Sequence, residues 1–226
     1  MTALALADDA LIAAQRLAEW CSRGPELEED IALANIALDQ LGTARLLLTH
    51  AGRESGRTED DLAYLRNDRE FRNCLLVELP NGDFAVTMVK LLFLAAYQKP
   101  LYESLSEDGE LGPIAAKAVK ESAYHLDHAT LWTIRLGDGT EESHRRAQAA
   151  VDDLWPYTHE LFEPPFEALR TTWLETVETT LDEATLKRPE DRWRPTGGRS
   201  GVHTEHLSRL LAEMQVLHRA HPGATW

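Results

Sequence analysis

The sequence has 226 residues, with 38 acidic against 23 basic side chains and a formal net charge of −15. This acidic balance, without a basic stretch, argues against nucleic acid as a partner. Two cysteines without a Cys-x-x-Cys spacing indicate neither a disulfide framework nor a thiolate metal site. Neither a signal peptide nor an apolar run of about 20 residues stands out, so we expect a cytoplasmic protein without membrane contact.

Apolar residues recur at helical spacing along the chain, and the alternating β-branched runs typical of strands are missing from the sequence. The fold class is therefore predicted to be all-α. The predicted helices cover residues 3–22, 26–54, 83–106, 111–136, 141–162, 165–186 and 204–220. Turn-forming composition predicts irregular connections at 56–82, with one short helical piece near 68–73, and at 187–202. Pro100 and Pro156 are expected to kink their helices.

No internal repeat or shift in composition marks a domain boundary, so we predict a single domain over residues 1–226. The second predicted helix carries an apolar stripe at steps of three and four and is apolar on other faces too, which predicts a central position. The stripe consists of Leu27, Ile31, Ala34, Leu38, Leu41 and Leu48. The equivalent stripe on helix 111–136 includes two polar residues, Ser122 and His125, and is the place to search for a site.

Inward-facing Glu and Glu-x-x-His residues mark the di-iron sites of helical bundles. The one literal match, Glu141 to His144, follows a glycine-rich turn, and an N-cap at Thr140 explains it better. Glu121 and His125 lie four residues apart, on one helical face, but a hydrogen-bonded histidine is the more common explanation of such a pair.

Two further patterns favour structure over chemistry. His203 and His206 lie three residues apart without the Glu of a zincin motif, which indicates packing or an interface. The glycines of 197–201 lack the ending of a phosphate-binding loop, and the sequence has no Gly-x-Ser-x-Gly, so no hydrolase or nucleotide site is predicted.

Five segments together resemble the PaaC-type subunit of bacterial phenylacetyl-CoA epoxidase. They are residues 16–21 with 25–28, 32–42, 78–85, 201–207, and 211–215 followed by the final Trp226. The resemblance spans essentially the whole chain, and the combination is more specific than any one segment. It implies a ferritin-like bundle, with a four-helix core and additional helices, in a complex that uses O2 and reducing equivalents to epoxidise the ring of phenylacetyl-CoA.

The resemblance also implies which iron ligands this chain has lost. The related PaaA-type catalytic subunit holds iron with motifs similar to Asp-Glu-x-Gly-His and Glu-x-x-His. Here Gln40 stands where the Glu of the first motif would be and Thr43 where its His would be. Ser122 replaces the Glu of the second motif, and His125 is kept. Neutral groups cannot compensate the charge of two iron ions, so we expect neither a di-iron site nor another cofactor in this chain.

These positions predict a vestigial site, a hydrogen-bonded polar core cluster of Asp39, Gln40, Glu121 and His125. The implied function is a non-catalytic structural or regulatory subunit. It would support a di-iron PaaA-type catalytic subunit, alongside a small accessory subunit and a reductase, in phenylacetate degradation. One alternative is an oxygenase chain that binds its own iron through Asp39, Glu121 and His125. Another is a ferritin-like homo-oligomer for storage, which would need the missing ligands.

Overall fold

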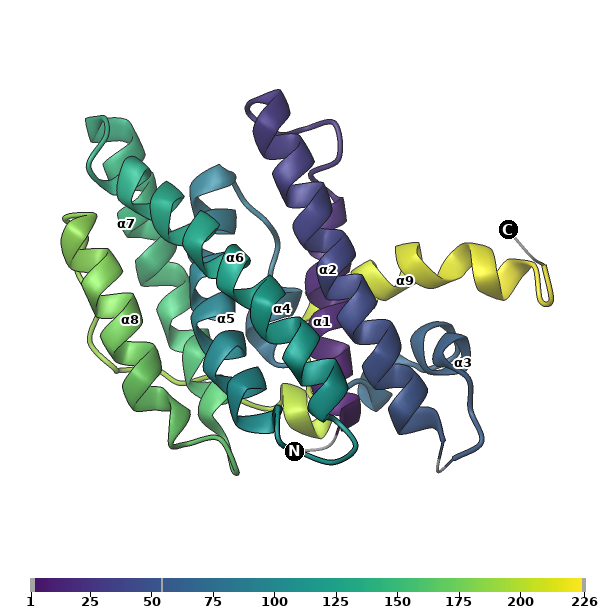
Figure 1. Cartoon of the computed structure of the whole chain (residues 1–226). Coiled ribbons are helices and arrows are strands. Elements are labelled where there is room, and N and C mark those ends of the chain that lie inside the picture. The colour runs from purple at the N-terminus through teal and green to yellow at the C-terminus, as the bar shows by residue number, and fades with distance from the viewer. Residues whose placement is uncertain (1–2, 54, 225–226) are drawn as a thin grey trace. The chain divides into compact units, whose positions relative to one another are not determined.

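The computed structural model describes residues 3–53 and 55–224, and the regular structure in these ranges is entirely helical. The α-helices are α1 (Ala3–Ala18), α2 (Leu27–Gly52), α3 (Glu59–Tyr64), α4 (Leu75–Glu78), α5 (Phe84–Leu105), α6 (Gly112–Gly137), α7 (Glu141–Leu154), α8 (Leu169–Glu183) and α9 (Glu205–Ala220). Short 3-10 helices are η1 (Asp68–Glu70), η2 (Trp155–Phe162) and η3 (Gly198–Ser200). The predicted all-α fold class is confirmed and is consistent with a ferritin-like bundle (Figure 1).

The chain divides into two compact units. Unit 1 contains the N-terminal part up to Pro80 together with the C-terminal part from Thr196, and unit 2 contains Asn81–Pro195. The predicted single domain over 1–226 stays a prediction.

In unit 1, α1 packs along α2, α4 packs on α1, and α3 packs on α2, while α9 contacts α3, α4 and η1. Three acids in the first turn of α2 suit the positive end of the helix. At its other end Gly52 is required by close packing, because a Cβ there would lie 2.1 Å from the carbonyl oxygen of Arg57. The sequence thus sets both ends of the longest helix in this unit.

In unit 2, α5 is buried on nearly all sides and α6, α7 and α8 pack around it. An aromatic cluster fills the core, with ring centroids 5.7 Å apart for Phe93 and Trp155 and 5.4 Å apart for Trp155 and Trp173. The indole Nε1 of Trp173 donates to the Phe93 carbonyl oxygen at 2.8 Å. These two tryptophans are core anchors, since each is 1% exposed.

Several sequence expectations need correction. The connection 56–82 contains the expected short helical piece, as η1, but it also contains α3 and α4, which its composition did not predict. The expected helix 141–162 ends at Leu154 and continues as η2, where Pro156 cannot donate a backbone hydrogen bond. The apolar stripe of α2 is not central, since Leu27, Ile31 and Leu38 are exposed. The final Trp226 lies outside the described residues.

Among the described residues, two helices, α2 and α5, are long and apolar enough to cross a bilayer by length and composition alone. In α5 the apolar window is 78% buried within the protein, as in a core helix of a soluble protein. In α2 that share is 44%, so more than half of the apolar window is not buried within the protein.

Candidate functional site

The first pair of predicted ligand positions lies on the buried face of α2. Gln40 and Thr43 are each 4% exposed and stand three residues apart, so their side chains share one face of the helix. The neighbouring carboxylate, Asp39, is half-buried. The buried face of α2 therefore presents an amide and a hydroxyl, which carry no charge to balance a metal ion.

The second pair lies on the buried face of α6. Ser122 is 2% exposed and His125 is 1% exposed. The ring of Tyr124 meets that of His125 edge-on, with centroids 6.3 Å apart. Glu121 is half-buried and forms an ion pair with Lys117, one turn earlier on the same helix. This face offers one imidazole, and the adjacent carboxylate of Glu121 pairs with an ammonium group.

The structure brings together the two residues of each pair, Gln40 with Thr43 and Ser122 with His125. The combined cluster of Asp39, Gln40, Glu121 and His125 stays a prediction, because α2 belongs to unit 1 and α6 to unit 2. The donor sets do not fit a di-iron centre, which needs several inward-facing carboxylates. Across residues 3–53 and 55–224, no three His, Cys, Asp or Glu side chains are grouped to hold a metal ion.

The Glu141 to His144 spacing belongs to a helix cap. The Thr140 hydroxyl accepts from the Ser143 backbone N–H at 3.1 Å, and the Ser143 hydroxyl in turn accepts from the Thr140 N–H at 2.9 Å. The Nδ1 atom of His144 lies 2.7 Å from the Gly137 carbonyl oxygen. The capping interpretation of this motif is confirmed.

Three of the segments that carry the family resemblance meet at Glu78, which is fully buried. Its carboxylate accepts from the Thr204 backbone N–H at 2.6 Å, from His203 Nδ1 at 2.8 Å and from Asn73 Nδ2 at 2.9 Å. Its backbone carbonyl accepts from Arg16 at 2.6 and 3.1 Å. Glu78 therefore joins three parts of unit 1 that are remote in sequence.

The same contacts define the chemistry of His203. Its Nδ1 faces the Glu78 carboxylate, and its Nε2 lies 3.1 Å from the Phe71 carbonyl oxygen. Both neighbours are hydrogen-bond acceptors, so the imidazole is held between a carboxylate and a carbonyl oxygen. A carboxylate so enclosed is suited to holding segments together and is not placed to act on a substrate.

Two adjacent aspartates of α1 form further buried ion pairs. Asp9 accepts from Arg199 at 2.8 and 2.7 Å and from the Cys74 backbone N–H at 2.7 Å. Asp8 accepts from both terminal nitrogens of Arg66 and from the Arg72 backbone N–H at 2.8 Å. Burial raises the pKa of Asp8, and the neighbouring guanidinium opposes this shift.

Sequence reasoning missed this network. Asp8 and Asp9 lie in the predicted helix 3–22, and their arginine partners are 58 and 190 residues away. Two acids inside an otherwise apolar helix were nevertheless a usable signal, since buried carboxylates require cationic or hydrogen-bonding partners.

In unit 2, Asp191 anchors the segment after α8. It accepts from Trp155 Nε1 at 2.8 Å, from Arg170 at 3.0 Å and from Arg188 at 3.2 Å, and His159 Nε2 lies 3.5 Å away. Partial burial opposes ionisation of Asp191, but the Trp155 hydrogen bond and the surrounding cations lower its pKa. Burial lowers the pKa of His159.

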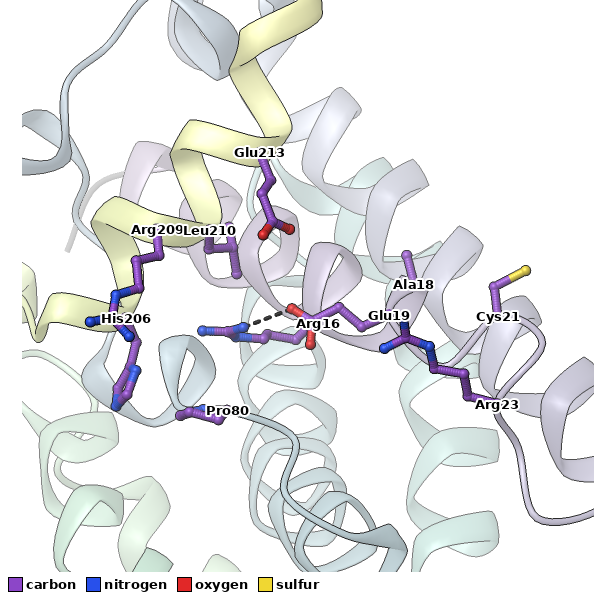
Figure 2. A pocket seen from close by; sticks show the side chains of 10 residues that line it. All are labelled: Arg16, Ala18, Glu19, Cys21, Arg23, Pro80, His206, Arg209, Leu210 and Glu213. Carbon is purple, nitrogen blue, oxygen red and sulfur yellow. Dashed lines mark hydrogen bonds and ion pairs between the residues drawn. The ribbon is translucent and has the colours of Figure 1, made fainter.

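A cavity of about 610 Å³ opens in unit 1 where the end of α1 faces α9 (Figure 2). Its polar walls are formed by Arg16, Glu19, Arg23, His206, Arg209 and Glu213. Arg16 is held by Glu19 at 2.7 Å and by the Glu78 carbonyl, whereas Arg23 and Arg209 are exposed. The three arginines outnumber the two glutamates, so the cavity suits an anionic group.

The described residues form an all-α protein, consistent with a ferritin-like bundle. Residues 1–226 match the family described as phenylacetic acid catabolic protein. The chain is 44% identical over 240 residues to the C subunit of 1,2-phenylacetyl-CoA epoxidase from Escherichia coli (strain K12), an alignment that covers 99% of this chain and 97% of that protein. The chain therefore belongs to the phenylacetic acid catabolic protein family, which confirms the resemblance drawn from its segments.

Proposed function

We propose that this chain is the non-catalytic structural subunit of a phenylacetyl-CoA epoxidase complex. The observation that carries the proposal is the burial of three neutral residues, Gln40, Thr43 and Ser122, at positions where the resemblance places iron ligands in the catalytic subunit. The similarity to a protein named as one of the subunits of that epoxidase supports membership in such a complex.

In this proposal the chain holds no cofactor, and the PaaA-type partner holds the di-iron centre and epoxidises the substrate. A small accessory subunit and a reductase complete the complex, which works in the cytoplasm without nucleic acid or membrane as a partner. The contacts of Glu78 and the two Asp–Arg pairs favour a structural role for the chain, because they give unit 1 a fixed arrangement of its helices.

A second candidate function is an oxygenase chain with its own iron, bound through Asp39, Glu121 and His125. The observation in its favour is His125, a buried imidazole on the face where the resemblance expects a ligand. Two observations weigh against it. Asp39 and Glu121 are only half-buried, and Glu121 is paired with Lys117.

Iron content separates the two candidates. We expect the chain purified from iron-supplemented medium to carry far less than one iron per chain, and His125→Ala to leave that value unchanged. The catalytic subunit prepared in parallel is the positive control and should carry about two iron ions. Near two iron ions per chain here, lost in His125→Ala, would overturn the proposed function in favour of the second candidate.

A further inference from the structure

The outward face of α2 is apolar. Leu27, Ile31, Leu38 and Leu41 are 71%, 53%, 63% and 37% exposed. They follow one another at helical steps and so share one face of the helix. Soluble proteins rarely leave a contiguous apolar surface of this kind uncovered unless it meets a partner. This face therefore needs an occupant that the packing of unit 1 does not provide.

The face borders a hollow with an apolar lining. A cavity of about 350 Å³ is bounded by Leu38 and Leu41 of α2, Leu11 and Ala14 of α1, and Met214 of α9. Side chains of leucine size fit a space of this kind, where they would exclude water from apolar walls on several sides. Leu38 and Leu41 thus form part of the rim of a concave site.

The apolar cavity adjoins the arginine-lined cavity, since Ala18 and Cys21 line both. Figure 2 shows Arg209 on α9 and Arg23 on the segment that follows α1, on opposite sides of Arg16 and Glu19. Arg23 and Arg209 are exposed residues, in a chain whose formal charge is −15. We call the two cavities and the apolar face of α2 together the docking groove.

We propose that the docking groove receives a helix of the catalytic subunit. The helix would place leucine-sized side chains at i, i+4 and i+7 in the apolar half and an aspartate or glutamate near Arg23 and Arg209. The charge complementarity favours an acidic segment at the arginine end. This inference rests on the proposed function for the existence of the partner and adds the surface that the partner uses.

A second copy of this chain is a poorer occupant. A two-fold contact through the docking groove would set the groove against itself, since an isologous interface uses the same patch on both copies. Two concave surfaces leave an empty space between them. In addition, Arg23 and Arg209 of one copy would face the same positive side chains of the other copy and repel them. A convex helix from a different subunit satisfies both the shape and the charge.

The test is binding of the purified PaaA-type catalytic subunit, followed by calorimetry and size exclusion. We expect Leu38→Glu to weaken binding by about 30-fold or more, as loss of an apolar anchor at an interface centre does. We expect Arg209→Glu to weaken it about 5- to 50-fold, with a smaller dependence on salt. The matched controls Leu131→Glu on α6 and Arg192→Glu, both exposed in unit 2, should bind within about twofold of the unchanged chain.

Circular dichroism checks that each variant stays folded, and Ile31→Glu serves as a second groove variant at an exposed site. If the unchanged chain binds the catalytic subunit and the groove variants bind equally well, the docking groove is wrong and the proposed function stands. If the unchanged chain does not bind at all, both fail. If Leu38→Glu only abolishes self-association, the occupant is a second copy and this inference is overturned.

Discussion

At the scale of single residues, the charged groups in the interior of unit 1 are paired. Arg199 and Asp9 form two hydrogen bonds of 2.8 and 2.7 Å with both side chains almost fully buried. A buried ion pair contributes little net stability compared with apolar residues, but removing one partner leaves a charge that neither water nor a counterion compensates. Each partner is therefore sensitive to substitution although neither contacts a substrate.

Replacing Arg199 by alanine tests this. We expect Arg199→Ala to lower the free energy of unfolding by about 3–5 kcal/mol, because Asp9 would be left buried without its cation. Urea unfolding followed by circular dichroism measures the change. The matched control is Arg45→Ala, which breaks an exposed ion pair with Glu59 and should have a much smaller effect, because water screens that pair. Equal effects of the two substitutions would mean that the Asp9 pair does not hold unit 1 together.

At the scale of elements, the sequence placed most long helices within a few residues. The prediction of 83–106 matches Phe84–Leu105, because a turn and an Asp83 N-cap mark the start. The end of helix 141–162 was missed, since a proline in the interior of a predicted helix is compatible with either a kink or a change to 3-10 helix. The exposed face of α2 was missed because apolar residues lie on several of its faces, and spacing alone cannot say which face is buried.

The segment after α8 was predicted only to be irregular, yet Asp191 fixes it. The pKa of Asp191 is lowered in the folded protein, so its carboxylate contributes stability that is present above its unfolded pKa of about 3.9. That contribution is lost as the pH falls through the lower folded pKa. As the pH is lowered, this segment should therefore detach at a higher pH than the one at which the apolar core of unit 2 unfolds.

We expect Asp191→Asn to lower the melting temperature at pH 7 by about 3–8 °C, as the loss of charge-assisted hydrogen bonds does in a protein of this size. The difference from the unchanged chain should shrink as the pH is lowered from 5 towards 2, because both proteins then carry a neutral side chain there. Thermal unfolding at several pH values measures this. Glu190→Gln, an exposed acid next to it, is the control and should have little effect at any pH. A difference that is the same at all pH values would contradict the ionised role of Asp191.

At the scale of the whole molecule, the candidate site was predictable only in part. The resemblance supplied Gln40, Thr43, Ser122 and His125, and all four are buried, which spacing alone could not establish. It also supplied the segments around Glu78 and His203, but their contact joins residues 125 apart, and a single sequence carries no signal for such a pair. What the segments have in common is a structural task, and this favours a support role for the chain.

A support role predicts how activity depends on this chain. We expect the chain alone to give no phenylacetyl-CoA turnover with a reductase and O2 present, because its ligand positions hold neutral residues. The catalytic subunit with this chain should turn over substrate, and without it the rate should fall at least about tenfold, which corresponds to about 1.4 kcal/mol of lost transition-state stabilisation. Turnover is measured as epoxide formed per catalytic subunit.

The rate of turnover depends on the interface between this chain and the catalytic subunit. An obligate interface buries more than about 2,000 Å², so a catalytic subunit deprived of it would expose a large surface that the complex covers. Adding His125→Ala in place of the unchanged chain should restore full turnover, because the proposed function gives that imidazole no part in oxygen chemistry. A catalytic subunit that works at full rate without this chain would contradict the support role. Turnover that disappears with His125→Ala while the complex still forms would instead indicate an oxygenase chain.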